Sequence, residues 1–218
     1  EKVSGSAAAD LAVVIVSAKD GIESGTESSV KLCKKNGIPV VFFINKIDDD
    51  NANFEKTVDD LRSKFGSSVV PFEVPVMDGK KMTGSEKVLD HPDSPHYDQI
   101  TEAIASADDE LMEKFFEGEP FTPEETAKGL KLALNSGDVK PVFAGSATSS
   151  AGVTHLLDFL KDNCPVYTDF GTVKDKDGTE LKTDDSEAFS ALVFKTVVDA
   201  FVGKISYVKV LSEIGRVH

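Results

Sequence analysis

Cysteine is scarce in this sequence, and long apolar runs are missing from it. Only two cysteines occur among the 218 residues, Cys33 and Cys164, and they are far apart and form no C-x-x-C pair. This spacing gives no support to a disulfide framework or a zinc site, so we expect two reduced thiols. No run approaches the roughly 18 apolar residues of a membrane span, and the polar start of the chain is unlike a signal peptide. We therefore expect a cytoplasmic protein with no membrane partner.

Basic residues are in short supply as well. The chain has 24 lysines and arginines against 38 aspartates and glutamates, which gives a formal net charge of −14. Such acidity disfavours non-specific binding to nucleic-acid phosphates, and it suits a basic protein partner or a local basic patch on a larger particle. With 40% apolar residues, the chain has the composition and length of one large domain or two modest ones.

The most informative motif is Asn45-Lys46-Ile47-Asp48, which directly follows the apolar run of residues 39–44. An N-K-x-D at the end of a buried strand is typical of guanine recognition. Guanine presents its N1–H and its exocyclic amine side by side, and the Asp48 carboxylate can accept from both, whereas adenine would leave the acid unpaired. Asn45 would offer its amide to the other edge of the base, and the stem of Lys46 can cover the purine face. The alternative is that these residues are only the polar end of a strand.

A second strand end supports the guanine interpretation. Residues 141–144 form another apolar run, which Gly145-Ser146-Ala147 and then a helical segment follow. A loop with Ser146 and Ala147 lets a backbone N–H approach the base oxygen, since a large side chain there would strike the purine. Two such loops at the carboxyl ends of parallel strands make a ligand pocket in open α/β sheets.

The rest of the chain alternates strand and helix patterns. We expect a strand at 11–16, helices at 24–35 and 54–65 with Asn53 as N-cap, an edge strand at 69–76, a loop-rich excursion at 77–98, a helical stretch from 100 to 115, a capping box at 122–125 that starts a short helix, a last helix around 153–160, and a hairpin of residues 189–195 and 204–211.

The histidines do not point to chemistry. His91 and His96 stand among three aspartates, where a divalent metal site can be imagined, but the prolines and the irregular spacing favour a solvated loop. His155 has no acid or cysteine neighbour that suggests catalysis, and we expect it to be a surface or packing residue. We therefore name no catalytic residue and no metal ligand.

Together these segments resemble bacterial elongation factor G and its paralogues among the translational GTPases, over nearly the whole chain. The resemblance is carried, in order, by residues 8–14 (AADLAVV), 20–21 (DG), 26–27 (TE), 45–48 (NKID), 108–114 (DDELMEK), 145–147 (GSA), 152–153 (GV), 156–157 (LL), 194–195 (FK) and 207–210 (YVKV). Most distinctive is the insertion of about a hundred residues between the guanine loop and Ser146-Ala147, because small GTPases have a far shorter connection there. In elongation factor G this insert is a subdomain called G-prime.

The resemblance implies an α/β fold: a P-loop-NTPase-like sheet lacking its N-terminal part, with an α+β insert, followed by part of a β-barrel. We assign residues 1–76 to the core of the GTP-binding domain with the start of the insert, and 77–138 to the G-prime insert. Residues 139–168 would end the GTP-binding domain, and 169–218 would be part of domain II, whose barrel begins near Glu187.

The resemblance also implies a ribosome-dependent GTPase that drives translocation of tRNA and mRNA. Its partners would be the ribosome, through rRNA and stalk proteins, and a guanine nucleotide, GTP or GDP. Asp48 would read N1 and N2 of guanine, Asn45 and Lys46 would position and cover the base, and Ser146 and Ala147 would close the pocket. The acidic stretch 108–113 would contact a stalk protein, unless it is simply a solvated helix face.

The chain departs from the family pattern in its phosphate machinery. It contains no G-x-x-x-x-G-K-[ST], so the backbone nest and the lysine that would hold the phosphates are missing. The D-x-x-G segment and its catalytic histidine are absent too, and none of His91, His96, His155 or His218 matches that histidine. We expect a fragment that does not hydrolyse GTP unaided, with the Mg²⁺ ligands elsewhere in the full-length factor.

Smaller departures lie near the end of the chain. Ala200 stands where the family usually has proline, and a hairpin looks skipped between Ser212 and Glu213. Two alternatives stay open. One is a paralogous translational GTPase, of the tetracycline-resistance ribosome protection type or the peptide-release factor three type. The other is a non-hydrolysing scaffold that docks on ribosomes or on protein partners.

Overall fold

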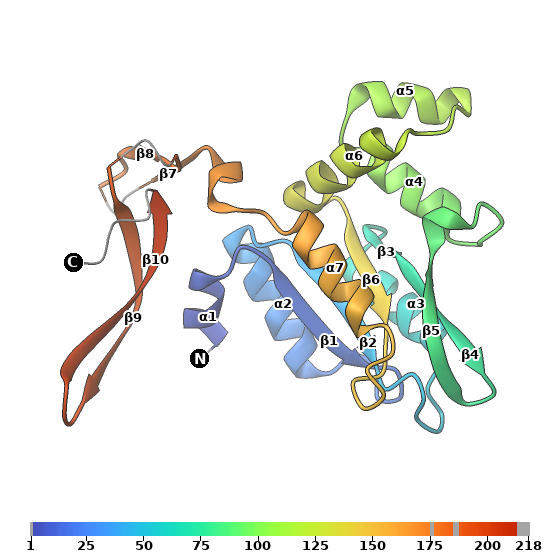
Figure 1. Cartoon of the computed structure of the whole chain (residues 1–218), viewed down its shortest axis with the longest axis horizontal. Coiled ribbons are helices and arrows are strands. Elements are labelled where there is room, and N and C mark those ends of the chain that lie inside the picture. The colour runs from blue at the N-terminus through green and yellow to red at the C-terminus, as the bar shows by residue number, and fades with distance from the viewer. Residues whose placement is uncertain (1, 175–176, 185–187, 213–218) are drawn as a thin grey trace. The chain divides into compact units, whose positions relative to one another are not determined.

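The computed structural model describes residues 2–174, 177–184 and 188–212 of the chain (Figure 1). The chain divides into two compact units. The larger unit is Leu11–Cys164, and the smaller one combines Glu1–Asp10 with Pro165–His218. Within the described ranges, none of the helices combines the length and the apolarity that a membrane crossing requires.

The larger unit is built on a parallel sheet of four strands in the order β1-β2-β6-β3. These strands are β1 (Ala12–Ser17), β2 (Val40–Asn45), β3 (Val69–Pro71) and β6 (Lys140–Ala144). In the parallel pair of β2 and β6, Ile44 lies opposite Ala144, so both strands end at the same edge of the sheet. The predicted α/β class with a parallel sheet is confirmed.

Helices cover both faces of this sheet. They are α2 (Ser24–Asn36), α3 (Phe54–Phe65), α4 (Tyr97–Ala105), α5 (Asp109–Glu117), α6 (Pro123–Ser136) and α7 (Val153–Asn163), with a 3-10 turn η1 (Val88–Asp90). Phe42 and Ile44 of β2 pack with α2 and α3 in one core, and Val41 and Phe43 pack with α4, α6 and α7 in the other. Because both faces of β2 are buried, its sequence is a continuous apolar run.

The helix ends follow the local sequence. The side chain of Asn53 caps α3 by accepting a hydrogen bond from the backbone N–H of Lys56, at 3.0 Å. Thr122 and Glu125 form the predicted capping box of α6, and Gly37 ends α2 in the left-handed conformation, with φ 65°. These predicted ends are confirmed, and each one satisfies backbone groups that the helix leaves without partners.

The segment after β3 differs from the prediction. We expected one edge strand at 69–76 and a loop-rich excursion at 77–98, but the chain leaves the main sheet after β3 and forms an antiparallel hairpin. Its strands are β4 (Glu73–Asp78) and β5 (Lys81–Lys87). In β5 only Met82 is a large apolar residue, and it is buried at 1% exposure. β5 is held mainly by backbone hydrogen bonds to β4 and has one large apolar side chain. Its sequence therefore lacks the alternation of apolar and polar residues by which a strand is recognised.

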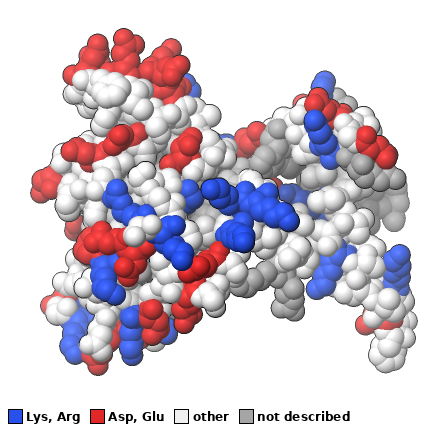
Figure 2. Space-filling view, turned by 180° about the vertical axis from the view of Figure 1, so that it is seen from behind, with Lys and Arg blue, Asp and Glu red and all other residues white. Residues whose placement is uncertain are grey.

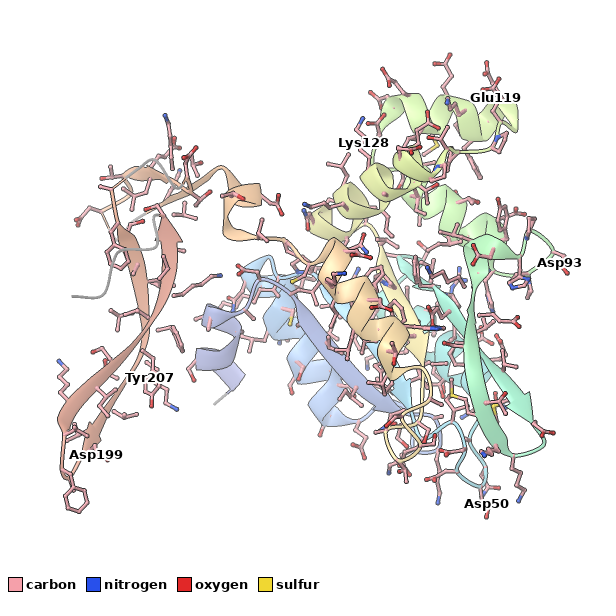
Figure 3. The ribbon with its side chains drawn as sticks, in the orientation of Figure 1. Asp50, Asp93, Glu119, Lys128, Asp199 and Tyr207 are labelled. Atoms are coloured by element: carbon pink, nitrogen blue, oxygen red, sulfur yellow. The ribbon has the colours of Figure 1, made fainter. Side chains whose placement is uncertain are left out.

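The helical stretch from 100 to 115 is two helices, α4 and α5, rather than one. Asp108 causes the break, because its side chain accepts from the N–H of Glu110 at 3.0 Å and so caps α5. Asp108 also pairs with Lys128 of α6, with Nζ and Oδ2 2.7 Å apart, and the hydrogen bond from Lys128 lowers the pKa of this carboxyl group below its ordinary value. Acidic side chains gather on the part of the unit that α5 forms (Figure 2), and Figure 3 labels Lys128 and Glu119 beside it.

The two loop histidines approach different acids. His91 Nε2 lies 3.5 Å from Glu86 Oε2, and His96 Nε2 lies 3.1 Å from Glu55 Oε2 of α3. His96 is also the N-cap of α4 and is 8% exposed, whereas most residues of 90–98 are exposed, as expected of a solvated loop. Across the part of the chain that the structure describes, no three His, Cys, Asp or Glu side chains are grouped so that they could hold a metal ion.

His155 has an acidic neighbour that its sequence context hides. Glu73 of β4 is 1% exposed, and its Oε2 accepts from the Ser85 hydroxyl at 2.5 Å and lies 2.9 Å from His155 Nδ1. A buried carboxylate requires such partners. The expectation that His155 has no acidic neighbour is therefore corrected, while His155 is an exposed residue as predicted and joins the β4–β5 hairpin to α7.

The smaller unit holds the end of the chain. It contains α1 (Lys2–Ala8), a 3-10 turn η2 (Tyr167–Phe170), β7 (Thr172–Lys174), β8 (Glu180–Lys182), β9 (Ser190–Asp199) and β10 (Gly203–Ser212). β9 and β10 form the predicted hairpin with longer strands than expected, and Asp199 accepts from the N–H groups of Phe201 and Val202 in its turn. Lys209 pairs with Asp10. The predictions made at Glu187, His218 and the break after Ser212 concern positions outside the described residues.

Candidate functional site

The parallel register brings the two predicted loops together. Asn45 is the last residue of β2, and Gly145 directly follows β6. The Gly145 N–H donates to the carbonyl of Ile44 at 2.9 Å, and the Ile47 N–H donates back to the carbonyl of Gly145 at 3.3 Å. Backbone hydrogen bonds thus join two loops that are about 100 residues apart in the sequence.

Side chains then connect the loops a second time. Asn45 Oδ1 accepts from the N–H of Ala147 at 2.9 Å, and the Ser146 hydroxyl donates to Asp48 Oδ2, also at 2.9 Å. Ser146 is 1% exposed and Asp48 is half-buried. An ionised carboxylate has about four lone-pair sites, so the bond from Ser146 orients Asp48 and leaves acceptor capacity for a ligand. Four of the five predicted site residues therefore share one network.

Lys46 lies beside this network rather than in it. Its φ is 64°, in the left-handed region that residues other than glycine rarely adopt. This conformation places Ile47 in the core at 5% exposure, while the Lys46 side chain stays 52% exposed and its Nζ lies 3.9 Å from Asp20 Oδ2. Strained backbone of this kind is concentrated at functional sites.

A third loop joins the site through Asp20, which sequence reasoning did not name as a site residue. The loop follows β1, where the Ser17 hydroxyl donates to Asp20 Oδ2 at 2.7 Å and the Asp20 N–H donates to Ser17 Oγ at 3.2 Å. The Ala18 N–H donates to the carbonyl of Asn45 at 2.8 Å. A signal was present, because Asp20-Gly21 follows an apolar strand just as the other two loops do.

Two glycines allow the second loop to fold this tightly. A Cβ at position 145 would lie 2.1 Å from Phe43 Cζ, and a Cβ at position 152 would lie 2.1 Å from the carbonyl oxygen of Ala144. Gly152 also has φ 73°. The Ser146 N–H donates to the Ala151 carbonyl at 3.0 Å and closes the loop. Sequence reasoning required small residues at Ser146 and Ala147 but gave these glycines no steric role.

The β4–β5 hairpin contacts the loop that follows the motif. Lys80, in the turn between β4 and β5, pairs with Asp50, the two atoms Nζ and Oδ1 being 2.5 Å apart; Figure 3 labels Asp50 at this edge of the unit. The edge thus presents an oriented carboxylate, an amide and a loop of small residues at the carboxyl ends of parallel strands. This arrangement is complementary to a planar base edge with two adjacent donors.

Comparison with known proteins places the chain among its relatives. Residues 1–166 match the family described as the elongation factor Tu GTP binding domain. The chain is similar to an elongation factor G-like protein of Thermotoga maritima, with 30% identity over 239 aligned positions that cover 99% of this chain and 35% of that protein. It is also similar to a crystal structure of a protein from Thermus thermophilus, with a TM-score of 0.79, 26% identity, and coverage of 97% of this chain and 33% of the other. The chain spans about a third of the length of each.

Proposed function

The chain belongs to the translational GTPase family that the elongation factor Tu GTP-binding domain defines, and from this premise we propose that it is part of a ribosome-dependent GTPase of the elongation factor G type. The step that we propose is translocation of tRNA and mRNA on cytoplasmic ribosomes. The observation that carries the proposal is the pair of side-chain bonds that join the two loops, Asn45 to Ala147 and Ser146 to Asp48.

In this proposal each residue of the network has one task. Asp48 accepts from N1–H and the exocyclic amine of guanine, and Ser146 holds its carboxylate in place. The stem of Lys46 covers the purine face. The N–H of Ala147 is engaged by Asn45 in this structure, so we propose that the guanine oxygen competes with the Asn45 side chain for that donor.

We propose that the phosphates and Mg²⁺ are held by another segment of a longer protein. The sequence contains no G-x-x-x-x-G-K-[ST] motif, whose backbone N–H groups and lysine would bind the phosphates. The same proposal assigns residues 77–138 to a G-prime insert and 169–218 to part of a β-barrel domain II. GTP turnover then belongs to the full-length protein, and guanine recognition belongs to this chain.

The proposal predicts that ribosomes stimulate GTP hydrolysis by the full-length protein. We expect stimulation of at least about 100-fold, because a partner that completes the phosphoryl-transfer site contributes about 10³ or more in related systems. Steady-state phosphate release, with and without ribosomes, measures it. GDP binding without stimulation would instead indicate a non-hydrolysing scaffold. Assays of mRNA movement, of tetracycline release and of release-factor removal separate a translocase from its paralogues.

We further propose that the exposed acids of α5 contact a ribosomal stalk protein. Asp109, Glu110 and Glu113 are exposed, whereas Asp108 is occupied by capping α5 and by Lys128. Like-signed acids on one short helix make the local electrostatic potential more negative and steer a basic patch of a partner towards the helix. The contact surface is therefore narrower than the acidic stretch from 108 to 113.

Reversing two of these charges tests the stalk contact. Asp109→Lys with Glu113→Lys in the full-length protein is expected to slow stalk-dependent GTP turnover at least about 10-fold at low salt, with a smaller effect at high salt. The matched control reverses two exposed acids elsewhere in the same unit, Asp59→Lys with Glu102→Lys. Equal turnover in both double variants and in the wild type would rule out this role for α5.

A further inference from the structure

A large cavity runs along α2, away from the guanine loops. Its volume is about 930 Å³, and it is lined by residues of α2, the loop 37–39, the end of α3, the end of α6 and Lys140. Val40 and Lys140 begin β2 and β6, whereas Asn45 and Gly145 lie at the other ends of these strands, and neither Asn45 nor Gly145 lines the cavity. Its size is at the upper end of small-ligand sites, which are about 300–1,000 Å³.

The residues that line the cavity are mainly basic among their charged members, whereas the chain as a whole is acidic. Four lysines and one acid line the cavity: Lys31, Lys34, Lys64, Lys140 and Glu27. The whole sequence has 24 basic and 38 acidic residues. Glu27 pairs with Lys64 at 2.8 Å, which leaves three lysines without an acid among the lining residues. On the face shown in Figure 2, lysine and arginine side chains gather in a band rather than scattering evenly.

These three lysines are not neutralised by their surroundings. Lys31 and Lys34 are three residues apart and share one face of α2, and within the described residues neither makes an ion pair. Lys140 donates only to neutral oxygens, Ser68 Oγ at 2.6 Å and the carbonyl of Gly137 at 3.1 Å. Burial, and then the neighbouring charge of Lys34, lower the pKa of Lys140. The charge of Asp138 acts in the opposite direction on this pKa, but Asp138 is exposed and accepts from Ser136.

The chemistry of the lining favours linked phosphates. Lysine ammonium groups are compact point charges that bind phosphate groups in proteins, and lysine is the basic residue that lines this cavity. Ser24 and Asn135 add hydroxyl and amide donors to the wall. At Gly37 and Gly137 the space that a Cβ would occupy is open, so a ligand can approach the backbone there. The volume is large for a single phosphate group.

We propose that this cavity binds a small polyphosphate anion, a compact ligand with two or more linked phosphate groups. The site is separate from the guanine pocket and does not depend on the function proposed above. Three lysines that form no ion pair with any described residue line one cavity in an otherwise acidic unit, and a polyanion relieves their mutual repulsion.

Calorimetric titration of the chain with inorganic tripolyphosphate at low ionic strength tests this site. We expect saturable binding of one anion per chain, and Lys31→Gln with Lys34→Gln is expected to weaken it at least about 10-fold, because hydrogen bonds to charged groups are stronger than those between neutral groups. The matched control removes two exposed lysines of the same unit, Lys81→Gln with Lys87→Gln, and is expected to change affinity less than about 2-fold. Circular dichroism confirms that both double variants are folded.

Four outcomes would overturn the proposal. Absence of saturable binding removes the site, and equal weakening by the two double variants reduces it to general charge attraction. Binding of a short RNA but not of tripolyphosphate would indicate a nucleic-acid contact instead. Loss of binding in Asp48→Asn would place the probe in the guanine pocket. Failure of guanine recognition, by contrast, leaves this cavity untouched.

Discussion

Replacing Asp48 by asparagine in the full-length protein is expected to exchange its preference for guanine nucleotides for a preference for xanthine nucleotides. The Asp48 carboxylate accepts from two adjacent donors of guanine, and an asparagine amide keeps one acceptor but offers a donor in place of the other. Xanthine has N1–H beside a carbonyl, which matches that amide. We expect GDP affinity to fall by roughly 100-fold or more and xanthosine diphosphate affinity to rise. Competitive binding of the two nucleotides measures the exchange.

Two controls separate base reading from loop stability. Asp49→Asn changes the neighbouring, exposed acid in the same loop and is expected to leave selectivity unchanged. Ser146→Ala removes the hydroxyl that donates to Asp48 Oδ2 and is expected to weaken GDP binding without a gain for xanthine. A full-length Asp48→Asn variant that keeps its preference for guanine would refute the assignment of Asp48 as the base-reading residue.

The parts of the fold that the sequence predicts are those where a local signal and the burial pattern agree. β2 is apolar at every position up to Asn45 because both of its faces are covered, and α3 has a capping residue, an apolar stripe and a terminal glycine. β5 gave no such signal, because its pairing with β4 uses the backbone and only Met82 is deeply buried. The break between α4 and α5 was not predictable for another reason. Apolar residues recur at helical spacing on both sides of Asp108, whereas the break depends on its capping of α5 and its ion pair with Lys128.

The candidate site was likewise predictable only in part. The sequence predicts four of its residues because they lie at or just after the end of an apolar run, and parallel strands end at one edge of a sheet. They are Asn45, Asp48, Ser146 and Ala147. Their interlocking was not predictable, since it depends on hydrogen bonds between residues about 100 positions apart. The pairing of Glu73 with His155 was hidden for the same reason. Side-chain contacts between residues far apart in the sequence produce no pattern that a single sequence reveals. A strand end, by contrast, can be recognised from the apolar run that precedes it.

Gly152→Ala is expected to destabilise the larger unit by about 3–5 kcal/mol, because two costs act together. The left-handed backbone, with φ 73°, costs an L-residue about 1–2 kcal/mol. The new Cβ would also lie 2.1 Å from the backbone oxygen of Ala144, an atom of β6 that cannot move without disturbing the sheet. Urea unfolding followed by far-UV circular dichroism measures the change, which suits a chain without tryptophan.

Gly118→Ala is the control that gives the backbone part of this effect alone, so the difference between the two variants is the steric part. Gly118 has the same φ of 73°, but a Cβ there would meet nothing within 4 Å, so only the backbone cost of about 1–2 kcal/mol is expected. Gly152 is also the N-cap of α7 and directly follows Ala151, whose carbonyl closes the loop that carries Ser146 and Ala147. Gly152→Ala should therefore weaken GDP binding by the full-length protein under conditions where it remains folded, while Gly118→Ala should not. Equal destabilisation by the two substitutions would mean that the contact with Ala144 does not set the position of the loop. The hydrogen bonds that Asn45 and Asp48 accept from Ala147 and Ser146 would then hold the loop together with the backbone hydrogen bonds.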